Sequence, residues 1–173
     1  MKKGKLIWIT GLSGAGKTTI ATAVFKKLKE KKANSVFLDG DIIRDVLNND
    51  LSHNPKDRLK NAYRISKLCE FLTSQNIHVV CSTMSLFKEI HQMNRKNIAN
   101  YYEIFVDVNI KELIKRDSKG LYSKAISGDM KNVIGIDLPY DKPENPFLTI
   151  ENTNSNISIE SKALHILTQV KLI

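Results

Sequence analysis

Short apolar runs, rich in β-branched residues, recur along the 173-residue chain between longer amphipathic stretches. Short apolar runs bounded by turn-forming residues are typical of the buried strands of a parallel sheet. Five segments have this character: 6–10, 35–38, 77–83, 103–108 and 147–150. The pattern therefore predicts a sheet of five strands.

Between these runs, apolar residues recur at the three- and four-residue spacing of one helix face. This spacing predicts helices over 18–31, 42–48, 55–74, 86–100, 110–115 and 157–170. Asn54 and Pro55 mark the start of the third helix, because asparagine is a favoured N-cap and proline is favoured at the first helical position. Alternating strands and helices predict a parallel sheet covered by helices on both faces.

The segment 117–146 interrupts this alternation. It mixes Gly, Lys and Asp, contains three of the four prolines and has little sustained periodicity. A connection of this length inside a compact domain is usually a lid or a binding loop. We expect a mobile lid here, carrying Lys119 and Lys124, within a single domain that spans 1–173.

The turn between the first strand and the first helix reads Gly-x-x-x-x-Gly-Lys-Thr over 11–18. In such a loop the glycines let successive N–H groups point at phosphate oxygens, and the helix N-terminus adds its positive dipole end. The lysine carries a charge for the β- and γ-phosphates, and the threonine hydroxyl can ligate Mg²⁺. We therefore expect ATP and Mg²⁺ as cofactors. The residues expected to bind ATP here are Gly11, Ser13, Gly14, Ala15, Gly16, Lys17, Thr18 and Thr19.

Composition adds little to this picture. The apolar runs are far too short to cross a bilayer, and the basic N-terminus leads into the phosphate loop rather than into a signal peptide. We therefore expect a cytoplasmic protein with no membrane partner. Cys69 and Cys81 lack the spacing of metal ligands and are interpreted as two buried thiols.

The formal net charge of +9 raises the possibility of nucleic-acid binding. Many of the lysines fall on the first predicted helix, however, and no aromatic-rich RNA-binding motif accompanies them. We interpret them as a solvated helix face and as part of a field that gathers small anionic substrates. The expected partner is a small-molecule nucleotide, not a nucleic acid.

Phosphoryl transfer also requires groups that bind Mg²⁺, orient the acceptor hydroxyl and hold the acceptor. Charged residues near the end of the second strand are candidates for these roles. Asp39 and Asp41 follow that strand directly. The carboxyl ends of parallel strands face the same crevice as the phosphate loop. Either carboxylate could serve Mg²⁺ or the acceptor hydroxyl. Arg44 and Arg58 could hold an anionic acceptor, and Asn61 lies on the same helix face as Arg58.

Several motifs, in their order along the chain, resemble the adenylylsulfate (APS) kinase family. They are GLSGAGKTT at the phosphate loop, LDGD-x-x-R over 38–44, DL followed by DR-x-x-N over 50–61, RD-x-KGLY over 116–122 and GID-x-PY-x-x-PENP over 135–146. The resemblance implies an α/β, P-loop nucleoside-kinase-like three-layer fold. It also implies a homodimer that uses MgATP to phosphorylate the ribose 3′-hydroxyl of a nucleotide.

The resemblance also implies roles for individual residues. Asp41 is the expected catalytic contact of the acceptor hydroxyl, with Lys17 and Lys119 as further catalytic residues and Arg116 on the ATP side. Thr18 and Asp39 are assigned to the metal, with Asp41 as the alternative carboxylate. The expected substrate-binding residues are Asp39, Asp41, Arg44, His53, Arg58, Asn61, Ser85, Lys119, Val133 and Ile134. Ser85 matches the family serine that can carry phosphate in an Ile-Ser-Pro motif, which reads Met-Ser-Leu here.

The chain departs from the family where the family reads the acceptor's base. The phenylalanine of the family's DLGF is His53 here, and the phenylalanine of GFTGID is Val133. Stacking on an aromatic side chain contributes about 1–3 kcal/mol per base. The loss of both rings therefore weakens an adenine pocket, unless His53 still stacks and Val133 packs on the other side of the base.

An offshoot of the family, the cytidine diphosphoramidate kinases of bacterial capsule biosynthesis, is similar in sequence to the APS kinases. A terminal phosphoramidate is close to a sulfate in size and charge, so the anion-binding residues could be reused while the base pocket changes. The sequence favours this acceptor over adenylylsulfate, the acceptor in sulfate activation. Two further alternatives are a nucleoside monophosphate kinase and a catalytically silent nucleotide-binding regulatory module. The match through the lid argues against the first, and the presence of Lys17 and Asp41 argues against the second.

Overall fold

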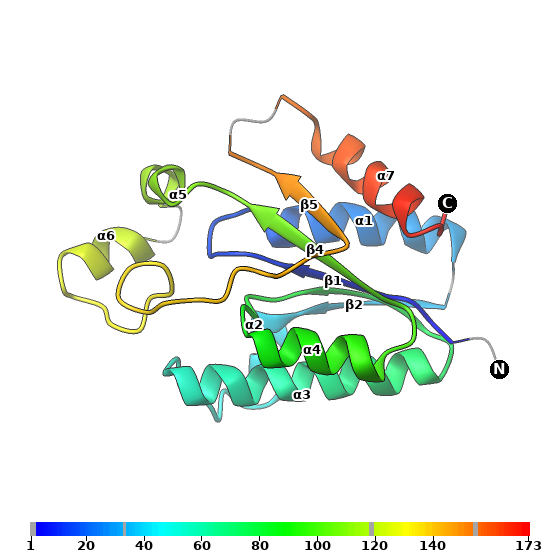
Figure 1. Cartoon of the computed structure of the whole chain (residues 1–173), viewed down its shortest axis with the longest axis horizontal. Helices are drawn as coiled ribbons and strands as arrows, with labels where there is room; N and C mark the ends of the chain where they lie inside the picture. Colours follow the sequence, from blue (N-terminus) through cyan, green and yellow to red (C-terminus); the bar gives the residue numbers. More distant parts are fainter. Residues whose placement is uncertain (1–2, 33, 118–119, 154–155) are drawn as a thin grey trace.

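A five-stranded parallel sheet forms the centre of the molecule (Figure 1). The computed structural model describes residues 3–32, 34–117, 120–153 and 156–173. The strands are β1 (Leu6–Thr10), β2 (Ser35–Asp39), β3 (His78–Ser82), β4 (Tyr101–Asp107) and β5 (Leu148–Glu151), in the order β2-β3-β1-β4-β5. All neighbouring strands pair in parallel. The predicted five-stranded parallel sheet is confirmed.

Helices cover both faces of the sheet. They are α1 (Lys17–Lys31), α2 (Gly40–Val46), α3 (Pro55–Ser74), α4 (Lys88–Asn97), α5 (Ile110–Arg116), α6 (Leu121–Ile126) and α7 (Ile159–Gln169). The long helices α3 and α4 lie together on one face, and α1 and α7 lie on the other (Figure 1). The three-layer α/β fold is therefore confirmed.

The central strand β1 explains why both faces need cover, because all of its residues are buried. Successive side chains of a strand point to opposite faces. Ile7 and Ile9 belong to the apolar cluster under α1 and α7, whereas Leu6 and Trp8 belong to the cluster under α3 and α4. This strand therefore contributes side chains to both cores and leads directly into the phosphate loop, whose buried residues Leu12 and Ala15 belong to the cluster under α1 and α7.

The start of α3 lies where Asn54 and Pro55 predict it. The Asn54 side chain accepts a hydrogen bond from the Asp57 N–H at 2.9 Å, and Pro55 occupies the first helical position. An N-cap of this kind satisfies one of the backbone donors that have no partner inside the helix.

Replacement of Asn54 by alanine is expected to lower the free energy of unfolding by about 1 kcal/mol, because the first turn of α3 loses its cap. Urea denaturation measures the change. The matched control is Asn97→Ala, at an exposed asparagine in the last turn of α4, which should stay within about 0.5 kcal/mol of the wild type. Equal stability of the Asn54 variant and the wild type would contradict a capping role.

The segment 117–146 contains a helix that the sequence pattern did not predict. Helix α6 is too short to show a sustained apolar period, and its N-terminus is instead set by one side chain. Asp117 accepts hydrogen bonds from the backbone N–H groups of Tyr122 and Ser123 at 2.9 and 3.0 Å. A hydrogen bond from the Ser123 side chain and these backbone bonds lower the pKa of Asp117, so its carboxylate remains charged at the positive end of the helix.

Helix α6 is attached to the phosphate loop. Tyr122 is 2% exposed, and its hydroxyl donates to the Ser13 carbonyl at 2.8 Å. Burial is the main cause that raises the pKa of Tyr122 to about 12, so the phenol remains a donor at neutral pH. The predicted lid residue Lys124 is exposed on α6. Lys119 lies outside the described residues, and its role stays a prediction.

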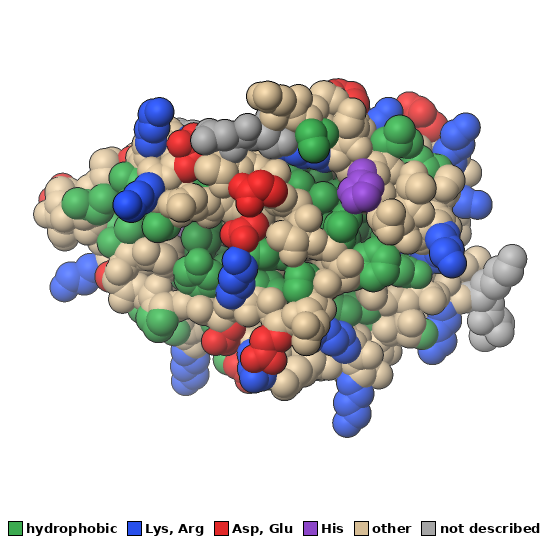
Figure 2. Space-filling model, turned by 45° about the horizontal axis from the view of Figure 1, so that its top comes forward, with side chains coloured by type: hydrophobic (Ala, Val, Ile, Leu, Met, Phe, Trp, Pro, Cys, Tyr) green, Lys and Arg blue, Asp and Glu red, His purple; other side chains and the backbone are tan. Residues whose placement is uncertain are grey.

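Basic side chains are dispersed over the surface. Figure 2 shows lysines and arginines spread around one face of the molecule, with acidic side chains among them, and no single basic patch on that face. Lys26, Lys29 and Lys31 on α1 are exposed, which agrees with the interpretation of a solvated helix face. Cys69 and Cys81 are buried and free, as predicted. None of the helices formed by the described residues combines the length and apolar character needed to span a bilayer.

Candidate active site

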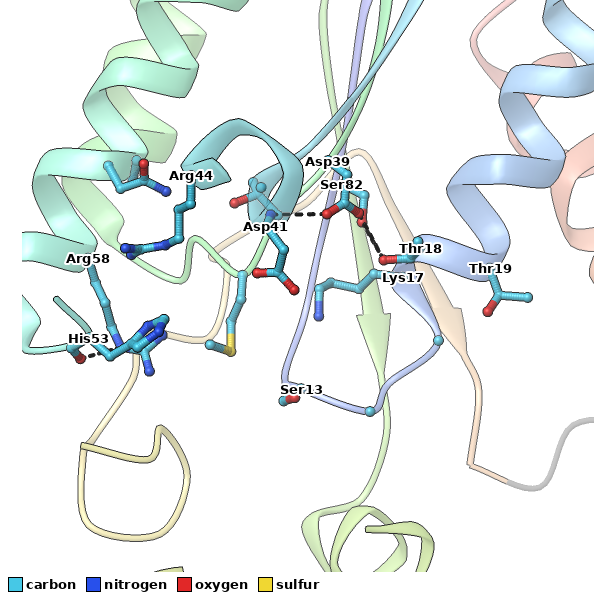
Figure 3. A pocket seen from close by; sticks show the side chains of 17 residues that line it. Ser13, Lys17, Thr18, Thr19, Asp39, Asp41, Arg44, His53, Arg58 and Ser82 are labelled. Atoms are coloured by element: carbon cyan, nitrogen blue, oxygen red, sulfur yellow. Dashed lines mark hydrogen bonds between the residues drawn. The ribbon is translucent and has the colours of Figure 1, made fainter. Parts of the chain in front are cut away.

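A pocket of about 320 Å³ opens at the carboxyl ends of β1, β2 and β3 (Figure 3). The phosphate loop forms one side of the pocket, and the starts of α2 and α3 form the other. Twelve predicted site residues contribute to its lining: Ser13, Gly14, Gly16, Lys17, Thr18, Thr19, Asp39, Asp41, Arg44, His53, Arg58 and Asn61. The structure therefore brings most of the predicted site into one cavity.

Three oxygen-bearing side chains meet where the phosphate loop enters α1. The Thr18 hydroxyl donates to Asp39 Oδ2 at 3.0 Å and lies 3.3 Å from the Ser82 hydroxyl. Asp39 is itself oriented by its other oxygen, Oδ1, which accepts the Asp41 N–H at 3.0 Å and caps α2. The Asp39 carboxylate thus belongs to this hydroxyl cluster, whereas Asp41 lies in the first turn of α2.

The Thr18 and Asp39 oxygens fit Mg²⁺. This ion prefers hard oxygen ligands and is usually held by one or two protein groups together with substrate phosphates and water. Among the described residues there is no group of three or more His, Cys, Asp and Glu side chains that could hold a metal. Thr18 and Asp39 would supply protein oxygens for an ion whose other ligands are substrate phosphates and water.

The lysine of the phosphate loop extends into the pocket (Figure 3). Lys17 Nζ donates to the Leu12 carbonyl at 2.8 Å, which keeps the ammonium close to the loop backbone. In the view of Figure 3, Asp41 lies between this lysine and the two arginines. The carboxylate thus occupies the middle of the pocket.

Two arginines line the side of the pocket opposite the phosphate loop. Arg44 Nη1 donates to the Leu51 carbonyl at 3.1 Å. Arg58 Nε donates to the His53 carbonyl at 2.7 Å, and its Nη2 donates to the Asn132 carbonyl at 3.1 Å. Arg58 therefore joins α3 both to the loop before it and to the segment that follows α6.

The charges of these arginines act on one another and on His53. Burial, followed by the Arg44 charge, lowers the pKa of Arg58. Burial also lowers the pKa of His53, and the charges of Arg58 and Arg44 lower it further, so His53 is a neutral ring at pH 7. An anion placed between the two guanidinium groups would relieve their repulsion. This end of the pocket therefore suits an anionic ligand.

Six predicted residues do not line the pocket: Gly11, Ala15, Ser85, Arg116, Val133 and Ile134. Gly11 and Ala15 are buried parts of the phosphate loop. Arg116 donates to the carbonyls of Asn152 and Thr153, beside the loop. Ser85 is 1% exposed, and its hydroxyl has no hydrogen-bond partner among the described residues.

The position of Val133 bears directly on the expected base pocket. Val133 is 2% exposed, and both Val133 and Ile134 belong to the apolar core rather than to the pocket wall. The backbone of this segment is held by Asp137, whose carboxylate accepts the N–H groups of Asn132 and Val133 at 2.7 and 2.6 Å. The side chain at position 133 is therefore part of the core and does not line the pocket.

Sequence reasoning missed five lining residues: Gly40, Ala62, Ser82, Thr83 and Met84. Ser82 ends β3, which lies between β2 and β1 in the sheet. Its position at the carboxyl end of a neighbouring parallel strand is a signal that could have placed it beside Asp39. Ser82 was not predicted because the order of the strands in the sheet cannot be read directly from the sequence.

A model of the adenylylsulphate kinase family matches residues 3–151. The chain is 42% identical over 167 residues to the cytidine diphosphoramidate kinase of Campylobacter jejuni, with 96% of each chain covered. It is 41% identical over 151 residues to an adenylyl-sulfate kinase of Clostridium acetobutylicum, covering 87% of this chain and 76% of the relative. The structure of the Mycobacterium tuberculosis APS kinase in complex with AMPPNP and APS matches with a TM-score of 0.89 and 35% identity, over 99% of both chains.

These matches agree with the geometry of the pocket. The family model covers the phosphate loop, both arginines and the segment after α6, and each of the three relatives is named as a kinase. The chain therefore belongs to the adenylylsulphate kinase family and is a phosphotransferase with a hydroxyl group as acceptor.

Proposed function

We propose that this kinase transfers the γ-phosphate of ATP to the ribose 3′-hydroxyl of cytidine diphosphoramidate, in capsule phosphoramidate biosynthesis. The observation that carries the proposal is the continuity of one pocket from the phosphate loop, past Asp41, to Arg44 and Arg58. A donor triphosphate at the loop and an anionic acceptor at the arginines would face each other across Asp41. The arrangement suits direct transfer between two bound nucleotides.

Each group has a part in this reaction. The phosphate-loop N–H groups and Lys17 bind the β- and γ-phosphates, and Thr18 and Asp39 would hold Mg²⁺, which neutralises charge on the phosphates. Asp41 orients the acceptor hydroxyl and accepts its proton. The hydroxyl oxygen forms a bond to the γ-phosphorus as the bond to the β,γ-bridging oxygen breaks, and ADP leaves.

The choice of a cytidine acceptor rests on the end of the pocket near His53. None of the described residues that line the pocket is Phe, Tyr or Trp. Val133, at one expected stacking position, is in the core. A pocket without two stacking rings loses an adenine-binding platform. The 42% identity to a cytidine diphosphoramidate kinase supports the same acceptor.

Adenylylsulfate is the alternative acceptor, since the Clostridium acetobutylicum relative is an adenylyl-sulfate kinase and is 41% identical. Phosphorus NMR distinguishes the two. The purified protein is incubated with MgATP and one acceptor in each tube, and ADP and a new ribose 3′-phosphate resonance are followed. Product from the cytidine compound alone supports the proposal, and product from adenylylsulfate alone overturns it. ATP turnover with neither acceptor phosphorylated would favour a regulatory nucleotide-binding module.

Replacement of His53 by phenylalanine is expected to shift the preference toward adenylylsulfate by about ten-fold in kcat/KM, because a ring at the pocket edge restores one stacking surface. Position 133 is unsuitable for this test, since a phenylalanine there would overpack the core. The matched control is His165→Phe at an exposed position on α7. An unchanged ratio of the two kcat/KM values in the His53 variant would contradict stacking as the basis of the preference.

We also propose that the protein acts as a cytoplasmic homodimer, which the family resemblance implies. Sedimentation equilibrium tests the assembly directly. A single species at twice the chain mass of 19.6 kDa is expected, and a monomer at micromolar concentration would contradict it.

A further inference from the structure

Asn152 lies outside the pocket lining but contacts the phosphate loop directly. It follows the last residue of β5, and its Nδ2 donates to the Ala15 carbonyl at 2.8 Å. A Cβ atom added to Gly16 would lie only 2.7 Å from the same nitrogen. Only glycine at position 16 leaves room for this approach.

The hydrogen bond to Ala15 has a consequence for the next residue. The peptide between Ala15 and Gly16 is planar and trans, so its C=O and N–H point in opposite directions. Anchoring the Ala15 carbonyl at Asn152 therefore turns the Gly16 N–H to the other side. Gly16 lines the pocket, where N–H groups of the loop are the donors for phosphate.

Such an anchor is needed because this peptide can otherwise turn over easily. Gly16 has a φ of 91°, and glycine adopts positive and negative φ about equally well. A turn of the peptide plane by half a rotation would present a carbonyl oxygen to the phosphates instead of an N–H. The Asn152 side chain opposes that turn.

The orientation of the Asn152 amide is set by a buried lysine. Lys162 on α7 is 4% exposed, and its Nζ donates to Asn152 Oδ1. An ammonium group can only donate, so the oxygen of the amide must face Lys162 and the NH₂ must face Ala15. Burial, followed by the charge of the nearby Arg116, lowers the pKa of Lys162, whereas the charge of Glu151 raises it.

Arg116 holds the backbone of the same residue. Its Nη2 donates to the Asn152 carbonyl at 2.8 Å and to the Thr153 carbonyl, while its Nε donates to Glu112 at 3.1 Å. The side chain of Asn152 is therefore fixed by α7 and its backbone by α5. Two helices converge on one asparagine that contacts the loop.

We propose that Asn152, oriented by Lys162, is a positioning residue that holds the Ala15–Gly16 peptide with its N–H toward the nucleotide phosphates. The inference rests on nucleotide binding at the phosphate loop and not on the identity of the acceptor. It assigns a role in ATP affinity to the residue that follows β5 and to a residue of α7, neither of which lines the pocket.

The test is Asn152→Asp, with ATP binding measured by titration calorimetry in the absence of acceptor. Aspartate keeps the shape of the side chain and its oxygen toward Lys162, but it has no N–H to donate to Ala15. We expect ATP to bind about ten-fold or more weakly, with the KM for the acceptor unchanged. Wild-type ATP affinity in the folded variant would overturn the proposal.

Asn109→Asp is the matched control, because it adds the same charge at the N-cap of α5 while the cap oxygen still accepts the Lys111 N–H. This control should bind ATP like the wild type, and a loss equal to that of Asn152→Asp would overturn the proposal in favour of a general charge effect.

A second variant, Lys162→Met, tests the orientation of the amide without changing Asn152. Methionine fits a buried site of similar length and leaves Asn152 Oδ1 without its donor. We expect ATP affinity to fall by about three-fold or more while kcat at saturating ATP is retained. If Asn152→Asp does not fold, the ATP affinity of Lys162→Met tests the proposal instead. Unaltered ATP affinity in Lys162→Met would overturn the proposal. These ATP titrations contain no acceptor. A negative acceptor assay would therefore count against the proposed acceptor and not against the role of Asn152.

Discussion

Replacement of Asp41 by asparagine is expected to lower kcat by about 10²- to 10⁴-fold, the usual contribution of a positioned general base. The amide has the shape of the carboxylate and keeps the backbone N–H that donates to Asp39, so α2 still begins at the same place. It cannot accept the proton of the acceptor hydroxyl. ATP should bind with nearly wild-type affinity, because Thr18, Lys17 and Asp39 are unchanged.

Steady-state kinetics gives kcat, and titration calorimetry gives the dissociation constant of ATP. Asp45→Asn is the matched control on the same short helix, since its side-chain oxygen can still accept the Asn49 amide as Asp45 does at 2.9 Å. The control should retain kcat within about two-fold. Parallel losses of ATP affinity and turnover in the Asp41 variant would place Asp41 at the nucleotide rather than at the acceptor.

Replacement of Lys17 by methionine should lower kcat/KM for ATP by about 10²- to 10³-fold, because a preorganised charge that stabilises the transferring phosphoryl group is lost. Methionine keeps the apolar part of the side chain, so thermal stability should change little. Lys17 Nζ is near the loop backbone, and the bond to the Leu12 carbonyl is replaceable by water.

The control for Lys17 is Lys26→Met, which removes one positive charge from the exposed face of the same helix. Its kinetics should match those of the wild type at physiological salt, where distant surface charges are screened. Retention of activity within ten-fold in the Lys17 variant, with the protein folded, would refute the role of the ammonium in transfer.

The parts of the fold that were predictable are those governed by local rules. The N-cap at Asn54 and the proline after it placed the start of α3 correctly, because capping depends on neighbouring residues alone. The phosphate loop and the apolar run before it placed β1 and α1 within a residue. Asp39 and Asp41 were predicted to face the phosphate loop because a strand end beside such a loop faces the same crevice, and both line the pocket.

The parts that were not predictable depend on contacts between distant segments. Helix α6 has too few residues for an apolar period, and its stability comes from Asp117 and from the Tyr122 contact with Ser13. Ser82 lies in the site because β3 is the neighbour of β2 in the sheet, and the sequence does not state this order. The burial of Val133 depends on how the segment after α6 folds back on the core, which no local pattern encodes.

Arg58 donates to two backbone carbonyls, at His53 and at Asn132, and strands β3 and β4 lie between these two residues in the sequence. An acceptor anion that draws this guanidinium toward itself must compete with both carbonyls. By thermodynamic linkage, the factor by which the bond to Asn132 weakens acceptor binding equals the factor by which the acceptor weakens that bond. A change in the segment around Asn132 that weakens the bond therefore raises acceptor affinity. With Arg58 in the proposed acceptor-binding role, changes around Asn132 can therefore alter acceptor affinity through the bond to Arg58.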